Sequence, residues 1–181
     1  ARSVMQVMAH PTALIVGPGV NGYNPKLDVR VKSDPEKAKK LLAEAGYPNG
    51  FETGMDCPTD RYVNDARICQ AVAAMLAKVN VKVNLLAQTR LKYFAKILGP
   101  GYNTSFYMLG WTPATYDAHN AFVNLLHTRD LPSHKGEINV DGWSNAKFDQ
   151  LTDAIAVETD MAKRDQMIDQ ANELLKEQVR P

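Results

Sequence analysis

The spacing of apolar residues along this chain switches between a helical period and a strand period, which predicts an α/β fold. Phe51 begins a short segment of strand character, residues 61–78 carry a broad apolar stripe at helical spacing, and residues 81–87 alternate apolar with polar positions. A strand, a helix and a strand with short connections form a βαβ unit with parallel strands. With a further apolar strand at residues 105–109, the pattern predicts one α/β domain over residues 1–181, with a mixed sheet and flanking helices.

Other segments carry the apolar stripe of an amphipathic helix. They lie at residues 35–45, 91–98, 117–126, 145–157 and 160–177. Residues 11–32 contrast with them, because this segment is rich in glycine and proline and has no helical period. We therefore expect a long, turn-rich loop there, of the kind that serves a function or wraps over a neighbouring element.

The composition is typical of a globular protein, with 45% hydrophobic and 23% charged residues and a net charge of +1. Since there is no basic run and no interleaving of basic with aromatic residues, we expect no nucleic-acid partner. No apolar run approaches the roughly 18 residues that a membrane-spanning helix needs. The chain starts at Ala1 without Met and stops at Pro181, and we expect it to be a piece of a longer protein.

Enzyme chemistry finds little support in the sequence. There is no GxSxG, P-loop or HExxH motif, so we expect no catalytic residue, no metal and no cofactor. His119 and His127 are eight residues apart and could share a helix face, but no third metal ligand accompanies them. Cys57 and Cys69 are too far apart for a CxxC motif, and whether they form a disulfide stays open.

The segment FYMLGWTPATYDAHNAF, residues 106–122, is the best candidate for a binding site. An apolar strand ends at Gly110 and Trp111 follows directly, at the strand end where open α/β sheets form their crevices. A tryptophan ring there offers a large apolar surface and one N–H donor for a ligand, or it belongs to the core. Asp117 either caps the following helix or contacts the ligand.

The segment SDPEKAKKLLAEAGYPNGF, residues 33–51, reads as a capped amphipathic helix followed by a tight turn. The sequence of this segment also resembles a signature of the peptide/nickel-type solute-binding proteins of ABC importers (family 5). Two further stretches resemble segments of that family and occur in the same order along the chain: GPGVNGYNP at residues 17–25 and WSNAKFDQL at residues 143–151. Together the matches extend from about Gly17 to Leu175.

The resemblance implies that the chain is the C-terminal lobe of a two-lobed receptor with a type II-like periplasmic-binding-protein fold. Its implied function is to capture a peptide or another small solute in an interlobe cleft. The implied partners are that ligand, the N-terminal lobe of the same protein and an ABC permease. The implied location is periplasmic or extracytoplasmic, with or without a membrane tether. The lobe would contact ligand through Trp111, Thr112, Asp117 and the loop around Tyr23.

The chain also departs from the family at two positions. Peptide-binding relatives carry an Asp three residues after the Trp, which pairs with the ammonium group of a peptide; here the position is Ala114, which puts recognition of a peptide N-terminus in doubt. Ala118 stands where those relatives usually have Pro. Two other functions stay open: a stand-alone α/β enzyme with a cleft near Trp111, and an interaction module that uses the polar loop at residues 128–142.

Overall fold

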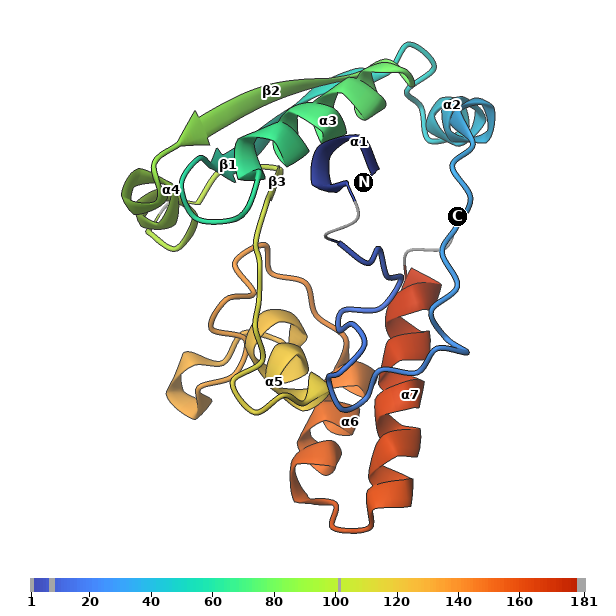
Figure 1. The fold of residues 1–181 in the computed structure, drawn as a ribbon, viewed down its shortest axis with the longest axis vertical. Coiled ribbons are helices and arrows are strands. Elements are labelled where there is room, and N and C mark those ends of the chain that lie inside the picture. The colour runs from blue at the N-terminus through green and yellow to red at the C-terminus, as the bar shows by residue number, and fades with distance from the viewer. Residues whose placement is uncertain (1, 7–8, 101, 179–181) are drawn as a thin grey trace. The chain divides into compact units, whose positions relative to one another are not determined.

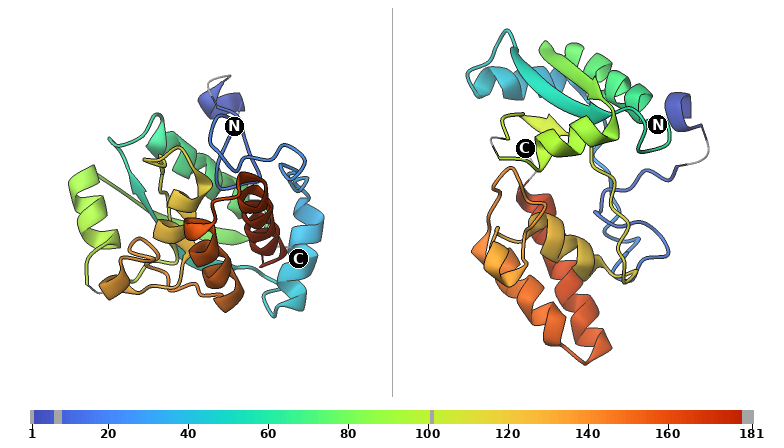
Figure 2. Two further views of the ribbon diagram at one scale, coloured as in Figure 1. Left: turned by 90° about the horizontal axis from the view of Figure 1, so that it is seen from below. Right: turned by 90° about the vertical axis from the view of Figure 1, so that its left-hand side faces the viewer.

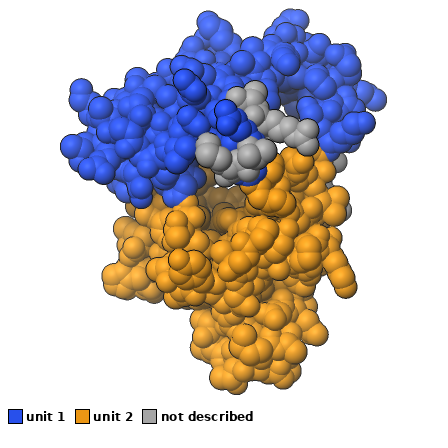
Figure 3. All heavy atoms as spheres, in the orientation of Figure 1, with its two compact units in different colours: residues 1–9, 32–110 blue, residues 10–31, 111–181 orange. Residues whose placement is uncertain are grey.

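The computed structural model describes residues 2–6, 9–100 and 102–178 (Figures 1 and 2). The chain groups in two compact units, which are coloured separately in Figure 3. Unit 1 comprises residues 1–9 and 32–110, and unit 2 comprises residues 10–31 and 111–181. Each unit has its own hydrophobic core, and the two are described in turn. That the whole chain forms one lobe of a larger receptor stays a prediction.

Unit 1 contains a three-stranded sheet with the order β2-β1-β3. β1 (Phe51–Pro58) runs parallel to β2 (Val81–Gln88), with Phe51 opposite Val81 and Pro58 opposite Gln88. These two strands and the helix between them confirm the predicted βαβ unit and the α/β class. The third strand, β3 (Phe106–Tyr107), is also parallel to β1 and is only two residues long, shorter than expected. Although a mixed sheet was expected, both ladders of the described strands are parallel.

One face of the sheet is covered by α3 (Asp65–Ala77). Met55, Cys57 and Cys69 are the buried residues of this core. Alternate residues of a strand point to opposite faces, so Asp56 faces away from this core. There Asp56 is fully buried and pairs with Lys96 of α4 (Arg90–Ile97) at 2.8 Å, so α4 packs on the opposite face.

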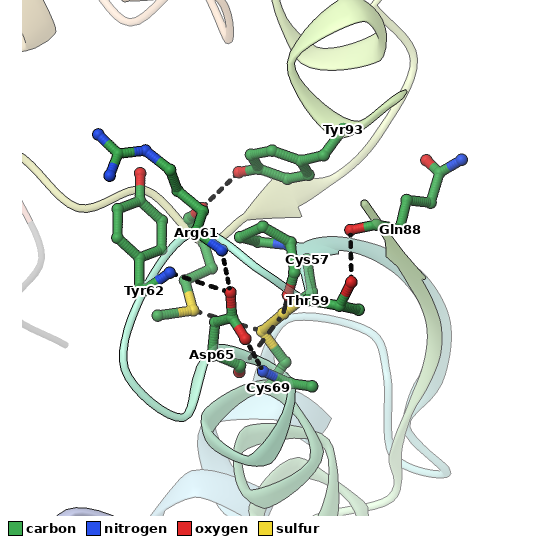
Figure 4. Close-up of a disulfide and its surroundings, with 11 residues drawn as sticks. Cys57, Thr59, Arg61, Tyr62, Asp65, Cys69, Gln88 and Tyr93 are labelled. Atoms are coloured by element: carbon green, nitrogen blue, oxygen red, sulfur yellow. Dashed lines mark hydrogen bonds between the residues drawn. A yellow bond between two sulfur atoms is a disulfide. The ribbon is translucent and has the colours of Figure 1, made fainter. Parts of the chain in front are cut away.

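A disulfide joins Cys57 at the end of β1 to Cys69 in α3 (Figure 4). Both cysteines are fully buried, and 12 positions separate them in the sequence. The bond therefore ties the strand end to the helix and closes the loop between them. The sequence had left this pairing open.

The helix after β1 begins at Asp65, four residues later than the apolar stripe suggests. The Asp65 carboxylate accepts backbone N–H groups of Arg61 and Tyr62 at 2.9 and 3.1 Å, which folds the preceding residues into a loop. Asn64 adopts a left-handed conformation with φ 58°, which ends that loop directly before the helix. A carboxylate that binds local backbone donors competes with helix formation, and here it delays the helix start.

Two short helices complete unit 1. α2 (Pro35–Glu44) begins and ends as predicted. The Asp34 side chain caps its start by accepting the Lys37 N–H at 3.0 Å, and Gly46 terminates it with φ 90°. No residue of α2 is buried. α1 (Arg2–Met5) is a single turn near α3. The sequence of residues 3–8, SVMQVM, is typical of the middle or end of a helix, and residues 7–8 lie outside the described residues.

Unit 2 is helical. α5 (Ala118–Ala121) runs directly into a π-helical segment, η1 (Phe122–Leu126), so the helix predicted over residues 117–126 is present but widens after one turn. A short 3₁₀ turn (η2, Leu131–Ser133) lies in the following loop. The helices α6 (Ala146–Val157) and α7 (Met161–Gln178) lie side by side in both Figure 1 and Figure 2. Their inner faces and α5 share one core, which also includes Val16 of the turn-rich loop; its buried residues are Val16, Ala118, Ala121, Phe122, Phe148, Ile155, Ile168 and Ala171.

Candidate ligand-binding surface

The four residues expected to contact ligand all belong to unit 2. Trp111, Thr112 and Asp117 lie in the segment that leads into α5, and Tyr23 lies in the turn-rich loop of residues 10–31. A parallel β-bridge between Asn21 and Asp117 joins the two segments. The structure therefore brings the expected residues into one unit and ties their two loops together.

Trp111 is the exposed tryptophan of the chain. The residue is 37% exposed, and its indole Nε1 donates a hydrogen bond to Oδ1 of Asn120 at 3.0 Å. Trp143, in contrast, is partly buried and packs edge-on against Phe148, with 5.4 Å between ring centroids. Trp111 is thus partly exposed while its indole N–H is held in one direction, which suits a binding surface better than a core position.

Asp117 is a structural anchor. Its side chain caps α5 by accepting the His119 N–H at 2.9 Å, which confirms the capping interpretation. Arg164 of α7 donates to both carboxylate oxygens at 2.7 and 2.8 Å, and Asn21 Nδ2 donates at 2.8 Å. Burial raises the pKa of Asp117, but hydrogen bonds from Arg164, Asn21 and the His119 amide outweigh it, so the pKa is lowered. The carboxylate therefore stays ionised and links the binding segment to α7.

Tyr23 also has a structural partner. Its ring packs against the core of unit 2, and its hydroxyl donates to Oδ2 of Asp28 at 2.8 Å. Asp28 further accepts the Ala13 N–H and the Thr12 hydroxyl, at 2.5 and 3.0 Å. The Ala13 amide, the Tyr23 hydroxyl and further hydrogen bonds lower the pKa of Asp28 to about 2. This cluster fixes the shape of the turn-rich loop, and a ligand contact of Tyr23 stays a prediction.

The remainder of the binding segment is exposed and uncharged. Thr112 and Ala114 are exposed, while Pro113 between them is buried and anchors the segment. Tyr116 is 67% exposed in a left-handed conformation with φ 52°, and its carbonyl accepts the Asn21 N–H at 2.9 Å. The segment thus presents two aromatic rings, those of Trp111 and Tyr116.

Unit 1 ends at Gly110, the residue before Trp111, and this glycine packs closely against a tyrosine ring. A Cβ atom at position 110 would lie 2.7 Å from the ring of Tyr62, so the ring or the backbone would have to shift to accept a larger residue. The Tyr62 hydroxyl donates to the Gly110 carbonyl at 3.3 Å (Figure 4 shows this tyrosine). The Tyr93 hydroxyl of α4 donates a hydrogen bond to the carbonyl of Met108, two residues before Gly110. These contacts fix the backbone of residues 108–110 within unit 1.

The histidines do not form a metal site with other ligands among the described residues. His127 is buried and lies 3.4 Å from Asp153 and 3.6 Å from Asp149. His119 is also partly buried, and burial, with the positive charge of Arg164, lowers its pKa. Both side chains therefore fit packing roles in unit 2.

Sequence reasoning missed Arg164 and the role of Asn120. Arg164 lies 47 positions from Asp117, in a helix whose polar face carries several other charges, so no local pattern marks it as the partner. Asn120 lies nine residues after Trp111, and only the short helical turn between them brings its amide to the indole.

Comparison with known proteins identifies bacterial solute-binding proteins as the relatives of this chain. The model of the family "Bacterial extracellular solute-binding proteins, family 5 Middle" matches residues 1–133. Heme-binding protein A of Haemophilus influenzae is 34% identical over 148 residues, which are 80% of this chain and 26% of that protein. The glutathione-binding protein GsiB of Pectobacterium atrosepticum is 32% identical over 135 residues, which are 72% of this chain and 26% of that protein.

Solved structures share the fold. HbpA2 from Haemophilus parasuis superposes with a TM-score of 0.72 at 30% identity, covering 86% of this chain and 30% of that one. The dipeptide-binding protein of Pseudoalteromonas sp. SM9913, solved in complex with Met-Leu, gives a TM-score of 0.80 at 26% identity, covering 98% and 35%. The chain thus spans about a quarter of the length of the curated relatives and about a third of these solved chains.

Proposed function

Because this chain belongs to the bacterial extracellular solute-binding proteins of family 5, we propose that it is one lobe of a receptor that captures a peptide or another small solute for an ABC importer. The relatives named above are solute-binding proteins, so the proposed activity is binding without catalysis. The ligand would bind between this lobe and an N-terminal lobe of the same protein. Closure of the two lobes around the ligand would then favour docking on the permease.

The observation that carries this proposal is the exposed, oriented ring of Trp111. An indole that is 37% exposed while its N–H is held by Asn120 has little freedom to reorient when a ligand arrives. A pre-oriented aromatic surface reduces the entropy cost of binding. Thr112 and the neighbouring Tyr116 would complete the contact surface, whereas Asp117 and Tyr23 would act through the shape of their loops.

Location outside the cytoplasm has independent support. Buried disulfides form and persist mainly in oxidising compartments, and Cys57–Cys69 is such a bond. We propose a periplasmic or outer-face location, with or without a membrane tether. Among the helices that the structure describes, none has the length and apolar character to span a bilayer.

A thermal-shift screen of the full-length protein tests the proposed function. The panel consists of dipeptides, oligopeptides, glutathione, heme, sugars and metal chelates, each added in excess. A solute that binds only the native state raises the melting temperature in proportion to the logarithm of its concentration. At least one solute is expected to give this dependence, and a full-length protein that no solute of the panel stabilises would contradict the function.

A further inference from the structure

The orientation of the Asn120 amide is fixed by its hydrogen bond to Trp111. An indole N–H can only donate, so the atom of Asn120 that faces it is the carbonyl Oδ1. The amino group, Nδ2, is therefore left as a donor, and it has no hydrogen-bond partner among the residues that the structure describes. Asn120 is half-buried, and Nδ2 is not among the side-chain atoms that are buried without a partner, so this donor beside the Trp111 ring remains within reach of a ligand.

The one carboxylate of the segment is not available to a ligand. An ionised carboxylate offers about four lone-pair positions. Asp117 fills them with two bonds from Arg164, one from Asn21 Nδ2 and one from the His119 N–H, all between 2.7 and 2.9 Å. A ligand cation would have to displace Arg164 to reach it.

The other side chains of the segment carry no charge. Residues 111–116 read WTPATY, and all of them except Pro113 are exposed. The surface around Trp111 therefore offers a flat apolar ring, an amide donor and hydroxyl groups, and within the segment it offers no free negative charge.

We propose that Trp111 and Asn120 bind a planar ligand group that carries an acceptor oxygen and no positive charge, such as a conjugated carboxylate or amide. The group stacks on the indole while its oxygen accepts a hydrogen bond from Nδ2 of Asn120. This inference rests on the proposed function and names the ligand chemistry of the same surface. An ammonium group is disfavoured there, because it would meet the Nδ2 donor, and the one carboxylate of residues 111–117 is already neutralised by Arg164. An indole face also attracts cations, so the amide donor is the group that decides the preference.

Titration of the ¹⁵N-labelled chain, followed by NMR, tests the proposal with two probes of similar shape and opposite charge, benzoate and benzylamine. The indole N–H signal of Trp111 is assigned with the variant Trp143→Phe, and the side-chain amide signal of Asn120 with Asn120→Asp. Benzoate is expected to shift both signals saturably and to bind at least about tenfold more tightly than benzylamine.

The variant Asn120→Asp is expected to reverse the preference between the two probes. The new carboxylate still accepts the Trp111 N–H but replaces the amide donor with a negative charge, so the preference should invert toward benzylamine. Asn103→Asp, at an exposed position of unit 1, adds the same charge elsewhere and should keep the preference for benzoate.

Three results would overturn the inference: benzylamine binding as well as benzoate, neither probe moving the two signals, or Asn120→Asp behaving like Asn103→Asp. These outcomes are separate from failure of the proposed function. A solute that stabilises the full-length protein without moving the Trp111 and Asn120 signals refutes only the inference. A full-length protein that no solute stabilises refutes the function.

Discussion

Replacing Arg164 by leucine removes the ion-pair partner of Asp117 and keeps most of the side-chain volume. The side chains of Arg164 and Asp117 are only 15% and 17% exposed, so the remaining carboxylate would be largely desolvated without its charge partner. Removing one partner of a fully buried pair costs about 3–5 kcal/mol. Because Asn21 and the His119 amide still donate to Asp117, we expect a smaller loss of about 2–3 kcal/mol in the free energy of unfolding.

Urea unfolding of the chain, followed by the fluorescence of Trp111 and Trp143, which both belong to unit 2, measures this loss. Arg164→Lys is the matched control: it keeps the charge but loses the two-point hydrogen bond, so it should cost less than Arg164→Leu. A double-mutant cycle with Asp117→Asn should give a coupling energy above about 1 kcal/mol. The reasoning is refuted if Arg164→Leu changes the stability by less than about 0.5 kcal/mol, the range of ordinary surface substitutions.

The same variant has a defined pH dependence. The folded-state pKa of Asp117 is lowered, so the carboxylate contributes stability above its unfolded pKa of about 3.9 and loses it as the pH falls through the lower folded value. The difference between the wild-type chain and Arg164→Leu should therefore be full at neutral pH and shrink in acid. A difference that grows below pH ~4 would contradict the ionised pair.

Three further predictions concern local anchors. Asp28→Asn should loosen the turn-rich loop at neutral pH, seen as faster amide hydrogen exchange there; since the folded pKa is about 2, the wild-type contribution holds above an unfolded pKa of about 3.9 and is lost as the pH falls toward 2. Replacing Cys57 and Cys69 together by serine should cost about 2–4 kcal/mol in denaturant unfolding, and a reductant should then have no further effect. Gly110→Ala should destabilise unit 1 through its contact with the ring of Tyr62, and Tyr62→Ala should relieve most of that loss in a thermal melt; equal losses with and without the ring would exclude the clash.

Elements with complete local signals could be predicted from the sequence. α2 has its cap at Asp34 and its terminating Gly46, and α6 has its cap at Asn145, whose side chain accepts the N–H groups of Lys147 and Phe148. β1 and β2 follow from their strand periodicity and the short connections of the βαβ unit. For α2 and α6 the deciding interaction lies within a few residues of the sequence, and for the βαβ unit the deciding signal is the short connection at each end of its helix.

Features set by distant or competing interactions could not be predicted. The late start of α3 depends on the hydrogen bonds of the Asp65 carboxylate to the backbone before it. The spacing of apolar residues carries no information on these bonds. The grouping of residues 10–31 with residues 111–181 joins segments far apart in the chain. Sequence periodicity carries no information on such pairings.

For the candidate site, the sequence predicted local features but not the distant partner of Asp117. The position of Trp111 after a strand left two interpretations open, a ligand contact or a core position, and the structure leaves 37% of the residue in solvent while the ligand contact stays a prediction. Asp117 was identified together with its capping alternative, which the bond to the His119 amide confirms. Its engagement by Arg164 could not be foreseen, because the arginine belongs to a helix that begins more than forty positions later.

The central claim is that Trp111 contacts the captured solute, and isothermal titration of the full-length protein with its stabilising solute tests it most directly. With 37% of a residue of about 250 Å² exposed, a ligand could cover up to ~90 Å², worth ~2 kcal/mol or roughly thirtyfold in affinity. Trp111→Ala should weaken binding by about that factor, while Trp143→Phe, which changes the other indole inside the core, should leave affinity within about threefold. Unchanged affinity in Trp111→Ala, or equal losses in both variants, would contradict the account.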